Sequence, residues 1–211
     1  MSEENDKVKE VHGNCLKIDL TPNWNYGYFL GLTLGDGSIW HSKRTGNYYI
    51  QLESTNRELV NLFREAGKIL GLHPTTEKPQ FRESSFSPKK LHYRTRASSK
   101  VLFSLLRPLK LDDSYWKLPS LPTKESRRGF LAGLFDAEGS VSKDRLDYSS
   151  KHVENLEQLL PLLKELELYE GKVEITPNYS SNEMYRLKIF GKGNRIKFSR
   201  ISPKLKVIKN E

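Results

Sequence analysis

Two apolar stretches dominate the hydrophobic pattern of this chain, and each ends in a carboxylate followed by a glycine. Residues 28–37 read YFLGLTLGDG and residues 130–139 read FLAGLFDAEG, so the two acids are Asp36 and Glu138. Small residues recur every fourth position in both stretches, and positions four apart lie on one face of a helix. One row is Gly27, Gly31 and Gly35 and the other is Gly129, Gly133 and Ala137, each beginning one residue before its stretch.

A glycine inside a helix costs about 1 kcal/mol relative to alanine, so these rows indicate a compensating contact. Rows of small side chains let two helices pack at short distance. We therefore predict that both stretches are helices, that their small faces pack together, and that Asp36 and Glu138 lie at the same end of the pair. Two carboxylates at the negative ends of two helices repel each other, which favours bound cations at that end.

The pattern outside these stretches predicts the same order of elements after each helix. In the first half we expect strands at 38–41 and 48–52, a helix capped at 54–56 and ending near 70, a second strand pair interrupted by a loop at 84–90, and a closing helix at 99–106. In the second half we expect a hairpin around 143–145, a helix at 152–168, strands at 172–176 and 185–190, and a closing helix at 194–200.

This order predicts an α+β fold with two pseudo-symmetric αββαββα halves, each holding an antiparallel sheet of four strands and joined through the two glycine-row helices. Residues 112–122 contain two prolines and little periodicity, so they read as a connector. The expected organisation is an N-terminal tail or arm at 1–20, a first half at 21–111, a linker at 112–122, a second half at 123–203 and a C-terminal tail at 204–211.

The charge of the chain points to a polyanionic partner. Lys and Arg number 35 against 26 Asp and Glu, which gives a net charge of +9. Much of this positive charge falls on the candidate strands, and no basic amphipathic helix with an aromatic face stands out. Nucleic acid is therefore favoured over a membrane surface as the partner.

Cysteine use and hydropathy bound the compartment. The single cysteine, Cys15, excludes an intramolecular disulfide and a multi-cysteine zinc site. The mean hydropathy of −0.65 and the short apolar runs argue against a membrane span, and no signal sequence is visible. We expect an intracellular, reduced compartment: cytoplasm or nucleoid in a prokaryote, with an organelle or the nucleus left open.

The second stretch resembles the LAGLIDADG motif of homing endonucleases almost letter for letter, as LAGLFDAEG at 131–139. The first, at 29–37, is a looser match with Leu34 where the motif has an acid. The chain is thus similar to the single-chain, two-motif members of that family. The resemblance implies a monomer with two saddle-like sheets that straddle a long, near-palindromic DNA site in the major groove. It also implies a metal-dependent double-strand break with short 3′ overhangs.

The resemblance also assigns a metal site. It implies that two or three Mg²⁺ ions are shared by Asp36 and Glu138, together with the backbone carbonyls of Gly35 and Ala137. Oxygen ligands of this kind suit a hard divalent cation. One acid would serve each DNA strand.

In the family a lysine and a polar residue order the attacking water. The lysine candidates here are Lys110 and Lys206, which follow the two closing helices, and the polar candidate is Gln51. Asp136 is interpreted as a structural hydrogen-bonding group, because Leu34 stands at the equivalent place in the first stretch.

Polar side chains on the exposed strand faces are the candidates for DNA contact, since Arg and Lys bind guanine edges and phosphates. Arg94 and Arg96 share one strand face, and Arg186 and Lys188 repeat that spacing in the second half. A solvated surface explains such arginines about as well as base contact does. The candidates are Lys43, Arg44, Tyr48, Arg82, Arg94, Arg96, Lys143, Arg145, Lys172, Tyr179, Arg186 and Lys188.

Two alternative functions would use the same scaffold. An RNA maturase would bind intron RNA and assist splicing, and a DNA-binding regulator would recognise a site without cutting it. The presence of both acids argues against the silent regulator and leaves the maturase open.

Overall fold

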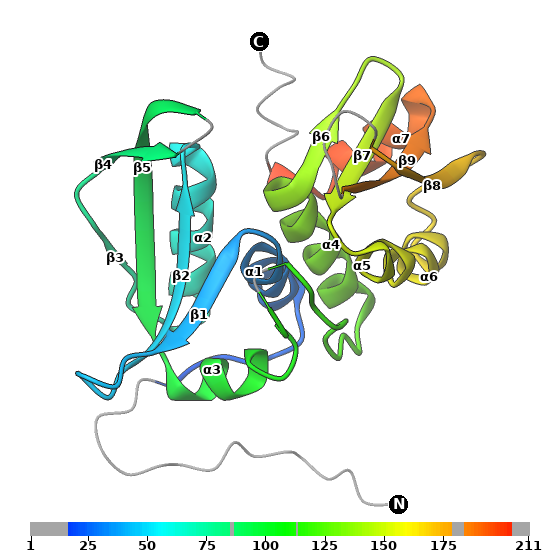
Figure 1. Cartoon of the computed structure of the whole chain (residues 1–211). Coiled ribbons are helices and arrows are strands. Elements are labelled where there is room, and N and C mark those ends of the chain that lie inside the picture. Colours follow the sequence, from blue (N-terminus) through cyan, green and yellow to red (C-terminus); the bar gives the residue numbers. More distant parts are fainter. Residues whose placement is uncertain (1–16, 85–86, 113, 179–183, 204–211) are drawn as a thin grey trace, which may run out of the picture.

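Two helices packed side by side form the centre of the molecule (Figure 1). The computed structural model describes residues 17–84, 87–112, 114–178 and 184–203. Helix α1 is Trp24–Gly35 and begins after Asn23, whose side chain accepts a hydrogen bond from the Tyr26 amide. Helix α4 is Lys124–Glu138 and begins with a capping box between Thr123 and Ser126. Each motif stretch is therefore a helix, as predicted.

The glycine rows of α1 and α4 face each other. A Cβ placed on Gly31 would lie 2.3 Å from the carbonyl oxygen of Phe130, and one on Gly133 would lie 2.2 Å from that of Tyr28. Both distances are far shorter than any real contact between these atoms. The backbones of the two helices thus touch where side chains would otherwise separate them, which confirms the predicted packing.

The first half contains one β-sheet, whose strands follow α1 in the chain. Its elements are β1 (Gly37–His41), β2 (Tyr48–Ser54), α2 (Arg57–Ile69), β3 (Thr75–Thr76), β4 (Gln80–Ser84), β5 (Ser87–Ser98) and α3 (Lys100–Leu106). The strands are antiparallel in the order β1-β2-β5-β3, and β4 also pairs with β5.

Two details of the first sheet differ from the prediction of four strands and a loop at 84–90. Among the described residues this sheet has five strands, because the two-residue β3 pairs with β5 at Arg96 and Thr95. Strand β5 already begins at Ser87, which pairs with Ser84 of β4. A two-residue strand has no periodicity to detect, and the Ser/Pro/Lys composition near 84–90 favours a loop only until a partner strand supplies hydrogen bonds.

The second half repeats this order after α4. Its elements are β6 (Gly139–Val141), β7 (Arg145–Ser150), α5 (Val153–Glu157), α6 (Leu159–Glu165), β8 (Val173–Pro177), β9 (Tyr185–Phe190) and α7 (Lys192–Ser199). Within the described part of this half, four antiparallel strands follow the order β6-β7-β9-β8. The strand predicted at 185–190 is β9.

The single helix predicted at 152–168 is wrong. Helix α5 ends at Glu157 and α6 begins at Leu159, with Gln158 between them. Pro161 explains the break, because proline has no amide hydrogen to donate to the carbonyl of Glu157 one turn earlier, and its ring crowds that carbonyl.

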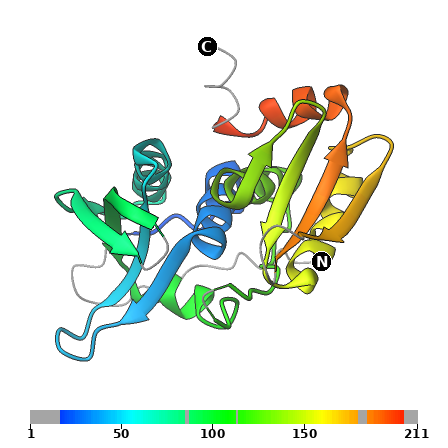
Figure 2. The same cartoon turned by 45° about the horizontal axis from the view of Figure 1, so that its top comes forward.

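Each sheet has one face on the helices and one face turned outward. In β2 the side chains of Ile50 and Leu52 are fully buried, whereas Gln51 and Glu53 point to the other side. We call the side of Gln51 and Glu53 the first outer face. The second outer face is the corresponding side of the second sheet, which carries Arg145. Figure 2 shows the two sheets on opposite sides of the α1–α4 pair. No helix in the described ranges has the length and apolar character needed to span a bilayer.

Candidate active site and DNA interface

The two acids of the motifs lie where the ends of α1 and α4 meet. Asp36 is exposed and directly follows α1, and its amide donates to the carbonyl of Leu32. Glu138 is the last residue of α4 and is half-buried. A Cβ on Gly35 would lie 2.6 Å from the Cβ of Ala137 and 3.3 Å from the Cγ of Glu138. The Cγ of Glu138 therefore packs against Gly35, the residue that precedes Asp36.

Lys110 lies against the same end of α1. Its side chain is buried, with the residue 4% exposed, and the Nζ donates to the carbonyl of Leu34 at 3.0 Å. The carbonyls of Thr33 and Gly35 also accept from it, each at 3.4 Å. An ammonium group at the negative end of a helix is stabilised by the terminal carbonyls that have no partner within the helix. A fixed positive charge thus stands beside Asp36.

The backbone of Lys110 is anchored by the segment read as a linker. Lys110 forms an isolated antiparallel bridge with Trp116, which is only 4% exposed. Asn155 of α5 holds this segment from the other half, since its side chain accepts from the Trp116 amide and donates to the Ser114 carbonyl. Residues that join the halves in sequence therefore also help to position the lysine. Lys206, the other lysine candidate, lies outside the described residues.

Gln51 lies on the first outer face close to the end of α1. Its cross-strand partners are Ser38 of β1, two residues beyond Asp36, and Arg96 of β5. Its counterpart in the second half is Asp147, because Gly37 pairs with Leu52 just as Gly139 pairs with Tyr148.

Asp136 is fully buried in the helix interface. It accepts a hydrogen bond of 2.7 Å from the hydroxyl of Tyr28 in α1 and another from the hydroxyl of Ser202, beyond α7. Burial and the charge of Asp136 raise the pKa of the Tyr28 hydroxyl far above its usual range. As interpreted from the sequence, Asp136 is a structural group: it ties α1, α4 and the end of the described chain together.

A cavity of about 210 Å³ opens beside Glu138. Its polar lining includes Ser114, Ser150 and Lys151, and Leu34 of the other half also contributes. These serines and Lys151 were missed as site residues. No sequence pattern points to them, because Ser150 and Lys151 come close to Glu138 only through the pairing of β7 with β6, which places Tyr148 opposite Gly139.

The DNA-contact candidates fall in four places. Lys43, Arg44 and Lys143 are exposed in the turns between paired strands. Tyr48 faces the helices, where its ring stacks on His41 and packs against Phe103, so Tyr49 takes the neighbouring place on the first outer face. Tyr179 lies outside the described residues. On or beside the two outer faces lie Arg82, Arg94, Arg96, Arg145, Lys172, Arg186 and Lys188.

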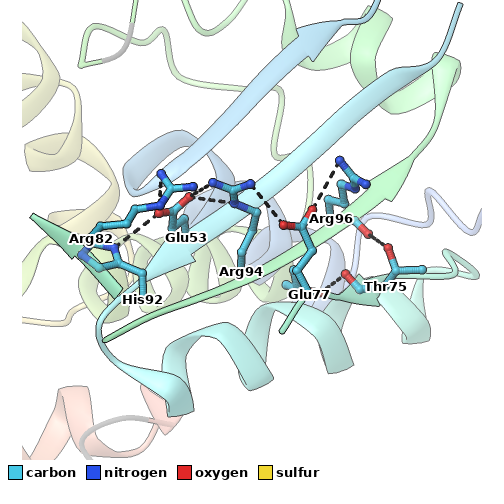
Figure 3. A network of polar contacts seen from close by, with 8 residues as sticks. Glu53, Thr75, Glu77, Arg82, His92, Arg94 and Arg96 are labelled. Atoms are coloured by element: carbon cyan, nitrogen blue, oxygen red, sulfur yellow. Dashed lines mark hydrogen bonds and ion pairs between the residues drawn. The ribbon is translucent and has the colours of Figure 1, made fainter. Parts of the chain in front are cut away.

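Carboxylates also lie on these outer faces, which the sequence reading did not anticipate. Figure 3 shows Glu53 and Glu77 among three arginines of the first outer face. On the second, Asp147 is 1% exposed beneath Arg145, whose Nε donates to both of its carboxylate oxygens at 3.0 and 3.2 Å. Glu174 of β8 pairs with Lys172 at 2.6 Å. Positive side chains therefore dominate both faces but are held by acids between them.

Residues 125–201 match the family model described as the LAGLIDADG-like domain. The chain contains a LAGLIDADG-like domain. A curated relative, an uncharacterized protein of Methanocaldococcus jannaschii, is 28% identical over 175 residues, which is 81% of this chain and 60% of the relative. The chain thus spans less than two thirds of the length of that relative.

Solved structures extend the LAGLIDADG likeness to both halves. The homing endonuclease I-DmoI in complex with DNA and Ca is 22% identical, with a TM-score of 0.59, over 90% of this chain and 99% of that chain. I-WcaI bound to its DNA recognition sequence is 18% identical, with a TM-score of 0.62, over 89% of this chain and 86% of that chain. At these identities the likeness establishes the fold. It confirms the resemblance to two-motif homing endonucleases and the predicted α+β architecture of two packed halves.

Proposed function

We propose that this chain is a site-specific DNA endonuclease that recognises a long duplex site with its two outer faces and cuts both strands between them. The observation that carries the proposal is the meeting of Asp36 and Glu138 at the junction of two basic sheets. A helix pair that served only for packing would need the glycine rows but would not need an acid at the same end of each helix. The DNA complexes of I-DmoI and I-WcaI support the choice of partner.

The donor atoms at this junction suit Mg²⁺. Two carboxylates and the carbonyl of Ala137 supply the hard oxygen ligands that this ion prefers. Among the described residues no group of three or more His, Cys, Asp or Glu gathers, so the protein provides only part of an octahedral shell. Phosphate oxygens of the DNA and water would complete it. I-DmoI, whose fold this chain shares, has been solved with Mn, with Ca and, in a variant, with Mg.

The residues around the junction divide the work of hydrolysis. A bound divalent ion would activate water and stabilise the charge on the leaving 3′ oxygen. Asp36 and Glu138 would hold such ions at the two scissile phosphates. Lys110 contributes a positive charge fixed by helix-end carbonyls, near the phosphate that approaches Asp36. Its Nζ also contacts the Gly35 carbonyl, so that oxygen would have to accept from the lysine and hold an ion at the same time.

Gln51 and Lys151 would act on the water and phosphate around the two acids. Gln51 projects from the first outer face beside the strand that follows Asp36, where its amide can orient a water. Lys151 lines the cavity next to Glu138 and offers a second cation there. Both roles need only hydrogen bonding and charge, and neither side chain has to move a proton.

The direct test supplies the chain with a duplex in which the sequences flanking its gene are joined without the insertion. With Mg²⁺ present, both strands should be cut at one place and the mapped ends should carry short 3′ overhangs. Binding to this duplex without cutting under any divalent metal would instead identify a silent DNA-binding protein. Binding to intron RNA in preference to the duplex would identify an RNA maturase.

A further inference from the structure

Arg94 lies at the middle of a continuous row of charged side chains on the first outer face (Figure 3). Its Nε and one terminal nitrogen contact the same oxygen of Glu53 at 2.8 and 2.6 Å. Its other terminal nitrogen contacts Glu77 at 3.1 Å. All three nitrogens of the Arg94 guanidinium are therefore engaged by the two carboxylates.

The two outer arginines of this row are bound differently. Arg82 contacts the remaining oxygen of Glu53 through one terminal nitrogen at 2.9 Å, and Arg96 contacts Glu77 through one terminal nitrogen at 3.3 Å. Within the described residues, each of them uses a single nitrogen in this way. The side chains of Arg82 and Arg96 are 43% and 36% exposed, whereas that of Arg94 is 22% exposed.

This difference decides which arginines can read a base. An arginine recognises guanine through two parallel N–H donors directed at the O6 and N7 atoms in the major groove. Arg82 and Arg96 keep donors for such a pair while one nitrogen anchors each of them. Three of the five N–H donors of Arg94 are taken by the two carboxylates, and its side chain is the least exposed of the three, so Arg94 is the arginine least able to turn a donor pair toward a base.

The carboxylates themselves need an explanation on a surface that faces phosphates. They lower the net positive charge of the face, which weakens sequence-independent binding. They also hold long arginine side chains that would otherwise lose rotamer entropy on binding. Arg96 has a second support, since its guanidinium carbon lies 5.1 Å from the ring centre of Tyr49. Glu53 and Glu77 thus weaken sequence-independent binding to DNA and fix the positions of the arginine side chains.

We propose, on the basis of the DNA-binding function above, that Arg82 and Arg96 read guanines in one half of the site and that Arg94 is a positioning residue. It acts through Glu53, which anchors Arg82, and through Glu77, which anchors Arg96. Arg94 reads no base of its own.

The second sheet provides an internal comparison. Arg186 holds the position equivalent to Arg94, because it pairs across the strands with Ser149 just as Arg94 pairs with Glu53. Among the described residues its ion-pair contact is with Asp147, at 3.9 Å from one terminal nitrogen, and its side chain is 34% exposed. Within that part of the chain, Arg186 is not held between two carboxylates as Arg94 is.

Sequence preference can be measured without cleavage by selecting bound duplexes from a randomised pool in the presence of EDTA and sequencing them. Arg82→Ala and Arg96→Ala should each lower a guanine preference at one position, by about tenfold, and the two positions should differ. Arg94→Met should weaken both of these positions together and no third one. Arg186→Met should affect the other half of the site alone.

Substitutions of the acids test the same row from the other side. Glu53→Gln should weaken the Arg82 position, and Glu77→Gln should weaken the Arg96 position. The matched control is Glu65→Gln, which makes the same charge change beside Arg64 and Lys68 on α2, away from the outer face. It should leave every position unchanged. Circular dichroism would confirm that each variant is folded.

Two results would overturn the assignment while leaving DNA recognition intact. One is an Arg94→Met variant that loses preference at a third position of its own. The other is that Arg94→Met keeps the preference for both guanines at the wild-type level and that Glu53→Gln keeps it as well. A wild-type chain that enriches no duplex sequence would overturn this assignment together with the proposed function.

Discussion

Tyr28 of α1 donates a 2.7 Å hydrogen bond to Asp136 of α4 across the fully buried helix interface. The same carboxylate accepts from the Ser202 hydroxyl, so one acid holds three segments that lie far apart in the sequence. A buried carboxylate is stable only when donors surround it. The motif position that carries Asp136 thus maintains the geometry on which Glu138, two residues later, depends.

Tyr28→Phe should lower the free energy of unfolding by about 1–3 kcal/mol, because it leaves the buried carboxylate of Asp136 with one donor fewer. Urea titration would measure the change. The matched control is Tyr26→Phe on the same helix, since the Tyr26 hydroxyl makes no side-chain hydrogen bond to the described residues although the residue is 7% exposed. Equal effects of the two substitutions would contradict the role assigned to the Tyr28 hydroxyl.

Two buried tyrosines predict a loss of stability at high pH. Burial raises the pKa of Tyr28 and of Tyr148 well above the ordinary value of 10.0. Above pH 10 the unfolded chain loses these protons and the folded chain keeps them. The stability that they contribute is therefore complete below pH 10 and falls as the pH rises. Each tyrosine should lower the free energy of unfolding by about 1.4 kcal/mol per pH unit.

Thermal or urea unfolding between pH 9 and about pH 12 would measure this slope. Tyr28→Phe and Tyr148→Phe should each reduce the slope by the contribution of one tyrosine, about 1.4 kcal/mol per pH unit. The double variant should remove both contributions. An unchanged slope in the double variant would show that other groups cause the alkaline loss.

The close contact of α1 and α4 predicts a strong asymmetry among glycine substitutions. Gly31→Ala would place a methyl group 2.3 Å from the Phe130 carbonyl oxygen, so the helices must separate, at a cost of about 3 kcal/mol or more. Gly193→Ala in α7 meets nothing within 4 Å and should stabilise the chain by about 1 kcal/mol. Melting temperatures would show both effects, and a Gly31→Ala chain as stable as the wild type would contradict the packing described.

Lys110→Met should both destabilise the chain and reduce cutting. The carbonyls of Thr33, Leu34 and Gly35 lose their buried donor, at a cost of about 1–3 kcal/mol. Lys100→Met on the exposed side of α3 serves as the control and should change neither stability nor cutting. If Lys110→Met cuts DNA at the wild-type rate, Lys110 has only a structural role.

The sequence predicted well the features that local pattern determines. The glycine rows specified the α1–α4 packing, because four-residue spacing fixes which side chains share a helical face. Strand β9 was likewise read at its observed limits, since Leu187 and Ile189 alternate with Arg186 and Lys188.

Features that depend on strand register could not be predicted in the same way. The sequence gives no sign that Glu53 lies opposite Arg94, because a shift of one residue would turn every side chain of β2 to the other face. For the same reason, the sequence does not show that Asp147 lies beneath Arg145 or that Lys151 lies beside the cavity at Glu138. The acid–arginine row of the first outer face is therefore a result of the structure alone.

The central claim is that Asp36 and Glu138 form the cutting centre, and paired measurements of binding and cleavage test it most directly. Asp36→Asn and Glu138→Gln should bind the target duplex as tightly as the wild type but should not cut it in Mg²⁺. Glu125→Gln, at the opposite, exposed end of α4, should bind and cut normally. Wild-type cutting by both Asp36→Asn and Glu138→Gln would contradict the account.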